Sequence, residues 1–229
     1  MTMKTIQIAA ESHTDATVEP SRSSLPRLCI VSSGREPDSS GTMLLELMEK
    51  LPATLPCIVQ IREKQLAAAS LLNLSRRVKA MGEASRALIV LNERIDIAAA
   101  AGLSGVHLPE SGCPPDKLSR LRHNMLIGKS AHSLESALDA DMLGADYLIF
   151  GPVFDTPSKR RYGSPQGLDK LEAVCHAVGV PVFAIGGVTT ENAKRCLSAG
   201  AHGVAALSLF YDNDTVSGIL TNLQRVLYR

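Results

Sequence analysis

The feature that most constrains this chain is a repeat of short, unbroken apolar runs, each followed at once by small or polar residues. Six runs show the pattern most clearly: 57–64, 88–94, 105–110, 126–132, 147–159 and 182–187. Buried parallel strands have this appearance, because helices cover both faces of the sheet. We interpret the runs as strands whose C-terminal ends carry one shared site, as in a (β/α)8 barrel.

The whole chain divides into eight such strands separated by amphipathic stretches. The expected strands are Leu28–Ser32, Ile58–Arg62, Ala87–Leu91, Gly105–Leu108, Met125–Lys129, Tyr147–Phe150, Val182–Ile185 and Gly203–Ala206. The expected helices are Met43–Lys50, Leu66–Met81, Asp96–Ala101, Pro115–Leu121, Ser133–Leu143, Gly167–Val178, Thr190–Ala199 and Ser217–Tyr228. This alternation predicts an α/β fold, a single (β/α)8 TIM barrel. The sequence lacks the early GxGxxG loop of a Rossmann sheet.

The 229 residues are close to the roughly 250 of a typical barrel domain. We expect residues 1–26, which are rich in Ser, Thr, Glu and Pro, to be a poorly ordered extension. Residues 27–229 would then form the barrel. No apolar run approaches the ~20 residues of a membrane span.

The balance of charge gives no reason to expect a nucleic-acid or membrane partner. There are 24 basic and 23 acidic residues, a formal net charge of +1, and aromatic residues make up 3% of the chain. The five cysteines form no CxxC pair, which fits the reduced thiols of a cytoplasmic protein.

The glycine pair Gly186-Gly187 ends the seventh expected strand and leads into a helix start. Glycines let backbone N–H groups approach an anion, and a helix N-terminus adds free donors. The eighth strand is followed by Ser208. Loops after strands seven and eight form the recurrent phosphate site of barrels, so we expect phosphate to bind here.

A second anion site is expected where cationic and amide side chains follow other strands. These residues are Arg62, Lys64, Asn92, Arg94, Lys129 and Lys159. Together they suit a pyrophosphate group. Two histidines also stand at strand ends. We interpret His107 as a satisfied core or rim residue, and His132 as a candidate proton shuttle or substrate contact.

Six segments, taken in order, resemble the motifs of one enzyme family. They are Gln60–Lys64, Leu91–Ala98, Gly105–Leu108, Gly128–Ser133, Gly151–Lys159 and Ala184–Gly187. The chain from about Leu28 to Phe210 is similar to the thiamine phosphate synthase and thiazole tautomerase (TenI-like) family. In the synthases a pyrimidine pyrophosphate ionises, Mg²⁺ helps pyrophosphate to leave, and a thiazole phosphate nitrogen attacks the pyrimidine methylene.

The resemblance also implies roles for individual residues. Pyrophosphate would be held by Gln60, Arg62, Lys64, Asn92, Ser130 and Lys159, with Ser130 and Lys159 closest to the chemistry. The thiazole phosphate would meet Thr156, Ser158, Gly186, Gly187 and the loop near Ser208.

The sequence departs from the synthase pattern at the metal ligands. Glu93 replaces the first metal-binding Asp, and Gly112 stands where the second is expected, which leaves Glu110 as a displaced substitute. Mg²⁺ prefers near-octahedral oxygen ligands with one or two carboxylates. Leu28-Cys29 also stands where the family has an aromatic residue.

These departures keep three interpretations open. The first is the synthase, with Mg²⁺ and with phosphate and pyrophosphate substrates. The second is a metal-free TenI-like tautomerase, in which His132 moves a proton to make a thiazole carboxylate phosphate aromatic. The third is a non-catalytic sensor of a thiamine ligand. The exposed helices of a barrel also make a homo-oligomer an expectation.

Overall fold

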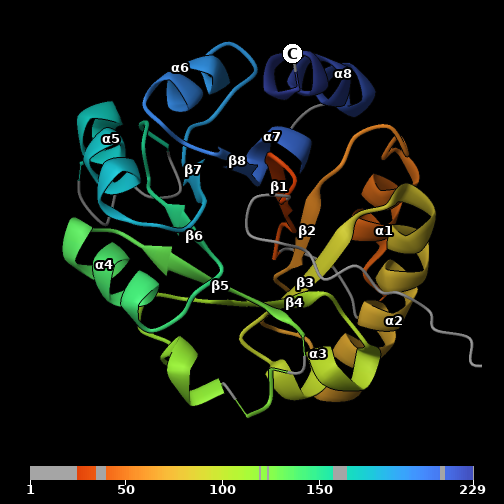
Figure 1. The fold of residues 1–229 in the computed structure, drawn as a ribbon. Helices are drawn as coiled ribbons and strands as arrows, with labels where there is room; N and C mark the ends of the chain where they lie inside the picture. The colour runs from red at the N-terminus through yellow and green to blue at the C-terminus, as the bar shows by residue number, and fades with distance from the viewer. Residues whose placement is uncertain are drawn as a thin grey trace, which may run out of the picture.

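Eight parallel strands close into a barrel surrounded by helices (Figure 1). The computed structural model describes residues 25–34, 40–118, 120–122, 124–156, 164–211 and 215–228. The strands lie around the barrel in chain order, and the eighth pairs with the first to close it. The expected (β/α)8 fold is confirmed. Of the extension expected over residues 1–26, residues 1–24 lie outside the described residues, and Leu25 is buried.

All eight expected strands are present, each within two residues of its expected bounds. They are β1 Leu28–Val31, β2 Ile58–Ile61, β3 Leu88–Asn92, β4 Gly105–Leu108, β5 Leu126–Ala131, β6 Tyr147–Phe150, β7 Val182–Ile185 and β8 Gly203–Ala206. Five of the eight (β1, β2, β4, β6 and β8) are buried along their whole length. Burial on both faces explains why the sequence shows unbroken apolar runs instead of alternation.

The helices form the outer layer (Figure 1). They are α1 Thr42–Glu49, α2 Ala68–Ser85, α3 Ile95–Ala101, α4 Leu134–Met142, α5 Gly167–Ala177, α6 Ala193–Ser198, α7 Ser208–Tyr211 and α8 Val216–Leu227. The short α7 was not expected, and it lies nearer the barrel axis than α8.

The helix expected over Pro115–Leu121 is wrong. Only a 3₁₀ turn, Pro115–Leu118, follows β4. Its hydrogen bonds are of the i to i+3 kind, from Lys117 N–H to the Pro114 carbonyl and from Leu121 N–H to the Leu118 carbonyl. Two adjacent prolines and so few apolar residues give a longer helix little to stabilise it.

Side chains alternate between the barrel interior and the helix layer. The apolar interior cluster consists of Leu25, Cys29, Val31, Ile58, Val90, Leu126, Tyr147, Ile149, Phe183 and Ala205. The larger cluster between strands and helices contains their neighbours along the strands, such as Ile30 and Val59. Because the interior cluster is apolar, any polar group inside the barrel near the C-terminal strand ends is a candidate for function.

The opposite end of the barrel, at the N-terminal ends of the strands, is tied together by the two ends of the described chain. Leu25 is buried, and its carbonyl accepts a hydrogen bond from His202 Nε2 at 2.8 Å. The Tyr228 hydroxyl, just after α8, accepts from Arg27 N–H and donates to the Pro56 carbonyl, both at 2.7 Å. Arg27 directly precedes β1, and Pro56 lies two residues before β2, so these contacts lie far from the strand ends that carry the motifs.

Among the described residues, no helix has the length and apolar character needed to cross a membrane. All five cysteine thiols are free, as expected for reduced cysteines.

Candidate functional site

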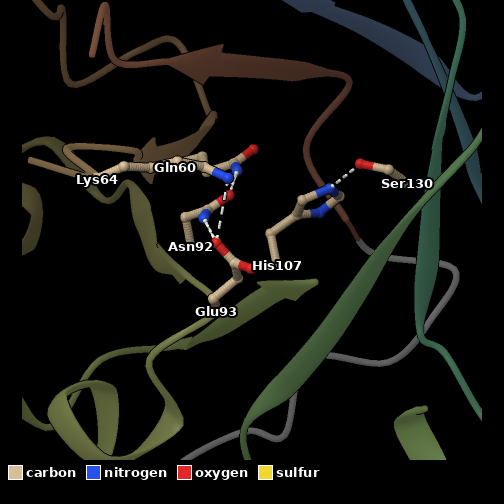
Figure 2. Close-up of polar contacts among 6 residues, drawn as sticks. All are labelled: Gln60, Lys64, Asn92, Glu93, His107 and Ser130. Atoms are coloured by element: carbon tan, nitrogen blue, oxygen red, sulfur yellow. Dashed lines mark hydrogen bonds and ion pairs between the residues drawn. The ribbon is translucent and has the colours of Figure 1, made fainter. Parts of the chain in front are cut away.

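Four polar side chains lie at the C-terminal ends of four consecutive strands. Gln60, Asn92, His107 and Ser130 come from β2, β3, β4 and β5. Asn92 and His107 are partners in the parallel ladder, which places their side chains on the same face. Gln60 Nε2 donates to Asn92 Oδ1 at 3.1 Å, and His107 Nε2 lies 2.9 Å from Ser130 Oγ (Figure 2). We call these four residues the polar layer.

His107 is held neutral by its surroundings. Its side chain is only 3% exposed, and burial together with the charges of Lys129 and Arg62 lowers the pKa of its imidazole to about 3. Within the described part of the chain, Nδ1 has no hydrogen-bond partner. A neutral imidazole has one ring nitrogen that donates and one that accepts, so His107 can offer Nδ1 to a neutral ligand.

Tyr147 is a polar interior residue that the sequence analysis missed, because it begins the apolar run of β6. Its hydroxyl is fully buried and has no hydrogen-bond partner among the described residues. Its ring lies 5.7 Å from the His107 ring, and a Cβ at Gly128 would lie 2.1 Å from Tyr147 Cζ. Gly128 therefore makes room for this ring. Buried polar atoms without partners are rare, so the pair marks a place where a ligand or water completes the bonding.

Lys64 and Glu93 bring charge to the edge of the polar layer. Lys64 Nζ lies 3.2 Å from Glu93 Oε2, and Asn92 Nδ2 donates to the same oxygen at 2.8 Å (Figure 2). Both charged side chains are about half exposed, at 51% and 43%. Glu93 adopts a left-handed backbone conformation, with φ of 65°, which turns the chain sharply at the end of β3. The expected neighbours Lys64, Asn92 and Glu93 are thus brought together.

Arg62 is positioned by a carboxylate that the sequence analysis passed over. Glu63 is 2% exposed, and it accepts hydrogen bonds from Ser32 Oγ at 2.5 Å and from Gly34 N–H at 3.0 Å. Ser32 Oγ in turn accepts from Arg62 N–H at 2.7 Å. This network joins the ends of β1 and β2. A buried acid in a strand-end motif was the available signal, because such a charge needs fixed donors.

Two of the cationic residues expected at the second anion site lie elsewhere. Arg94 forms a two-point contact with Asp96 at the start of α3, including Nε to Oδ1 at 2.9 Å. Lys129 follows Gly128 on β5, so it points away from the interior, and its ammonium donates to the carbonyls of Gly112 and Cys113 at 3.0 and 3.2 Å. The expectation that these two residues converge on the cavity is wrong, since each has a local partner.

The two candidate metal ligands do not come together. Glu93 contacts Lys64 and Asn92, whereas Glu110 accepts a hydrogen bond from His132 N–H at 2.9 Å. Burial acts to raise the pKa of Glu110, but hydrogen bonds from Ser136 and His132 outweigh it and hold the pKa below its usual value. In the part of the chain described, no group of three or more Asp, Glu, His or Cys side chains could hold a metal ion. These residues do not fit a two-carboxylate Mg²⁺ site.

His132 lies between β5 and α4 with a fixed ring orientation. Its Nδ1 is 2.5 Å from the carbonyl oxygen of Gly151, at the end of β6. A carbonyl can only accept, so the neutral ring carries its proton on Nδ1 and presents Nε2 as a lone pair. His132 is exposed, and its ring lies on the same rim as the polar layer.

The glycine pair after β7 is shaped by the loop that follows β6. Gly186 and Gly187 have φ of 95° and 63°, in the left-handed region. A Cβ at Gly186 would lie 2.5 Å from Pro152 Cβ, and one at Gly187 would lie 2.5 Å from the Asp155 carbonyl. Gly187 O accepts from Asn192 Nδ2 at 2.9 Å. Only glycine fits this close approach of two loops.

Two of the remaining candidates lie on segments that follow β6 and β8. Thr156 lies on the β6–α5 loop, half-buried, and Ser208 is the exposed first residue of α7, two residues after the end of β8. Ser158 and Lys159 lie outside the described residues.

The fold and this arrangement define a (β/α)8 barrel whose polar groups gather at the C-terminal strand ends, where barrel enzymes carry their active sites. Comparison with known proteins places the chain in one family of such barrels. The family model described as thiamine monophosphate synthase (TMP-TENI) matches residues 28–210. The chain belongs to this family, as its motifs led us to expect.

Individual relatives agree with that membership. A protein of Aquifex aeolicus, provisionally named a second thiamine-phosphate synthase, is 40% identical over 188 residues, which is 82% of this chain and 99% of the relative. The thiamine-phosphate synthase of Moorella thermoacetica is 35% identical over 190 residues, 82% of this chain and 90% of the relative. The structure of thiamine phosphate pyrophosphorylase from Pyrococcus furiosus superposes with a TM-score of 0.75 at 28% identity, covering 88% of this chain and 95% of that one.

Proposed function

We propose that this protein is a thiamine-phosphate synthase, a transferase that joins a hydroxymethylpyrimidine pyrophosphate to a thiazole phosphate and releases pyrophosphate. The observation that carries the proposal is the polar layer. Gln60 and Asn92 lie beside Lys64 at one side, and His107 bonds Ser130 at the other. The left-handed backbone of the glycine pair after β7 supports a separate anion site there. Two anion sites on one rim suit two phosphorylated substrates.

The reaction requires a carbon–oxygen bond to break before a carbon–nitrogen bond forms. The bond between the pyrimidine methylene and pyrophosphate breaks, and the bonding electron pair leaves with pyrophosphate. Arg62, Lys64, Asn92 and Ser130 stabilise the negative charge that develops on this leaving group, together with Lys159. The thiazole nitrogen then donates its lone pair to the methylene carbon. Since the carboxylates do not fit a Mg²⁺ site, no step is assigned to the metal.

Each substrate needs its own contacts on the rim. The thiazole phosphate would meet backbone N–H groups of the Gly186-Gly187 turn and of the α7 start at Ser208, since helix starts and glycine turns favour anions. Thr156 and Ser158 would contact the thiazole partner. The unpartnered polar atoms of His107 and Tyr147 offer hydrogen bonds to the heterocycle of the pyrimidine.

The direct test is formation of thiamine phosphate from the two purified substrates, measured with and without Mg²⁺. We expect product from the wild-type protein, and a loss of at least about 10-fold in rate for Ser130→Ala, because one hydrogen bond to a developing charge is removed. Asp96→Asn, which alters a carboxylate paired with Arg94, serves as the control and should keep the wild-type rate. Absence of product at high enzyme concentration, with both substrates shown to bind, would contradict the synthase.

One observation favours a second candidate, the thiazole tautomerase. The Gly151 carbonyl fixes the proton of His132 on Nδ1, and so leaves Nε2 free to take a proton from a substrate. In that case His132→Ala should abolish aromatisation of a thiazole carboxylate phosphate while phosphate binding persists. An unchanged rate in this variant would remove His132 from the role.

The partners in this proposal are small phosphorylated molecules. Homo-oligomerisation and a cytoplasmic location stay predictions from the sequence.

A further inference from the structure

We propose that this chain binds the pyrophosphate group without a protein-held Mg²⁺ ion, and that Glu93 weakens this binding by competing for Lys64. The inference deepens the proposed function and rests on the pyrophosphate site described there. Its basis is that the two candidate carboxylates, Glu93 and Glu110, and the carbonyls of Gly112 and Cys113 each have another bonded partner.

The β4 loop forms a tight turn at the position where a metal-binding carboxylate would stand. Gly112 N–H donates to the Pro109 carbonyl at 2.8 Å, which closes a four-residue turn over Pro109-Glu-Ser-Gly112. A Cβ at Gly112 would lie 2.9 Å from Pro109 Cδ and 3.0 Å from the Pro109 carbonyl oxygen. Both distances are shorter than ordinary contacts, so an aspartate side chain at residue 112 would require Pro109 to shift.

The ammonium group of Lys129 donates hydrogen bonds to carbonyl oxygens at the end of this turn. Lys129 is 7% exposed, and its Nζ lies 3.0 Å from the Gly112 carbonyl oxygen and 3.2 Å from that of Cys113. These are the oxygens that the loop could offer a cation after the loss of the aspartate. A metal ion there would have to displace a fixed positive charge, and two cations repel each other strongly in a buried place.

The carboxylate of Glu110 is directed toward α4. It accepts the His132 N–H at 2.9 Å, and a further hydrogen bond from Ser136 helps to hold its pKa low. Moving Glu110 to a metal would leave the N–H of His132 with only the weaker contact to Ser136 Oγ at 3.2 Å. The β4 loop as a whole is therefore bonded to β5 and α4.

Of the two candidate metal ligands, Glu93 then remains at the end of β3, and it is an ion-pair partner of Lys64. The 3.2 Å ion pair and the 2.8 Å bond from Asn92 Nδ2 involve the same oxygen, Oε2. Mg²⁺ requires about six oxygen ligands with strict geometry, and one carboxylate alone supplies a poor site. A pyrophosphate group needs Lys64 and Asn92 itself, so Glu93 competes with it for both donors.

Glu93 as a metal ligand and Glu93 as a competitor predict opposite effects of Glu93→Gln on the affinity for pyrophosphate. As a metal ligand, Glu93 would strengthen pyrophosphate binding, and Glu93→Gln would weaken it in the presence of Mg²⁺. As a competitor, Glu93 would weaken binding, so that Glu93→Gln would tighten it. A half-exposed ion pair contributes about 0.2–1 kcal/mol, which corresponds to a tightening of about 1.4- to 5-fold.

The experiment is calorimetric titration of inorganic pyrophosphate into the full-length protein, in buffer with a chelator and again with Mg²⁺. Wild-type protein, Glu93→Gln and the control Asp96→Asn are compared. The control removes one carboxylate of the same charge that is bonded to Arg94, away from Lys64. We expect the wild-type protein to bind pyrophosphate in the buffer with chelator. Glu93→Gln should bind more tightly in both buffers, and Asp96→Asn should change the affinity less than Glu93→Gln does.

Three outcomes would contradict the proposal. They are binding that requires Mg²⁺, weaker binding by Glu93→Gln, and equal tightening in Asp96→Asn, which would reveal only a general effect of net charge. Failure of the wild-type protein to bind pyrophosphate in either buffer would overturn the proposed pyrophosphate site itself. Lys64→Met tests the pyrophosphate site separately, because it should weaken pyrophosphate binding in the buffer with chelator.

Discussion

His107 shows how one buried side chain couples the site to stability. Its pKa of about 3 in the folded protein lies far below the value near 6.5 of an unfolded chain, because burial disfavours the charged ring. As pH falls below 6.5, the His107 imidazole becomes protonated in the unfolded state but stays neutral in the folded state. The free energy of unfolding should therefore fall with pH. From pH 7 to pH 5 we expect a loss of about 2 kcal/mol from this residue.

Urea denaturation at several pH values tests the prediction. His107→Gln removes the titrating ring and keeps a polar side chain, so its unfolding free energy should change less between pH 7 and pH 5. Equal pH dependence in the two proteins would show that His107 is not the source. His202, whose Nε2 bonds the Leu25 carbonyl, provides the comparison histidine.

At the residue scale, the sequence indicates which residues lie near the candidate site better than it indicates their hydrogen-bond partners. Motifs and strand ends point to Lys64, Asn92 and Ser130, and the structure places all three in or beside the polar layer. Their hydrogen-bond partners could not be predicted, because a sequence does not say which face of a strand a residue lies on until the register is known. Lys129 was assigned to the cavity for this reason, although it lies on the opposite face from Gly128 and Ser130.

At the scale of elements, α4 is fixed by its first turn. Ser133 Oγ accepts the Ser136 N–H at 3.1 Å, and the Ser136 hydroxyl bonds back toward the start of the helix, which forms a capping box. We expect Ser133→Ala to lower the free energy of unfolding by about 1 kcal/mol, because a helix donor loses its partner. Thr215→Ala at the start of α8 is the matched control, since Thr215 makes no side-chain cap hydrogen bond. A comparable loss in both variants, measured by urea denaturation, would contradict the role of the cap.

The elements themselves were largely readable from the sequence. Apolar runs predicted every strand, and Ser133 and Gly200 were correctly read as a helix start and a helix stop. The exceptions were the turn after β4 and the short α7. Both are helical segments of four residues, too short to show a periodic apolar face.

At the scale of the molecule, barrel closure depends on contacts between distant parts of the chain. The Tyr228 hydroxyl joins Arg27, the residue before β1, to Pro56, two residues before β2. Tyr228→Phe should lower the free energy of unfolding by about 1–2 kcal/mol, because it removes two hydrogen bonds while keeping the ring. Gln224→Ala removes the single exposed bond to the Thr54 carbonyl and should cost less. Thermal and urea unfolding of the two variants give the comparison, and an effect of Tyr228→Phe no larger than that of Gln224→Ala would contradict this role.

The closed topology could be predicted from the count and spacing of the strands, but this contact could not. Nothing in the sequence connects Tyr228 with Arg27, which are 201 residues apart. Such pairs become neighbours only because β8 returns to β1.

The position of Leu25 and Tyr228 has a practical consequence. Both ends of the described chain are bonded to the N-terminal side of the strands, whereas the polar layer and the glycine pair lie at the C-terminal side. An affinity tag, a fluorophore or a surface linker attached after the last residue would therefore leave the rim of the barrel facing solution. Immobilised protein should accept small phosphorylated molecules as readily as protein free in solution.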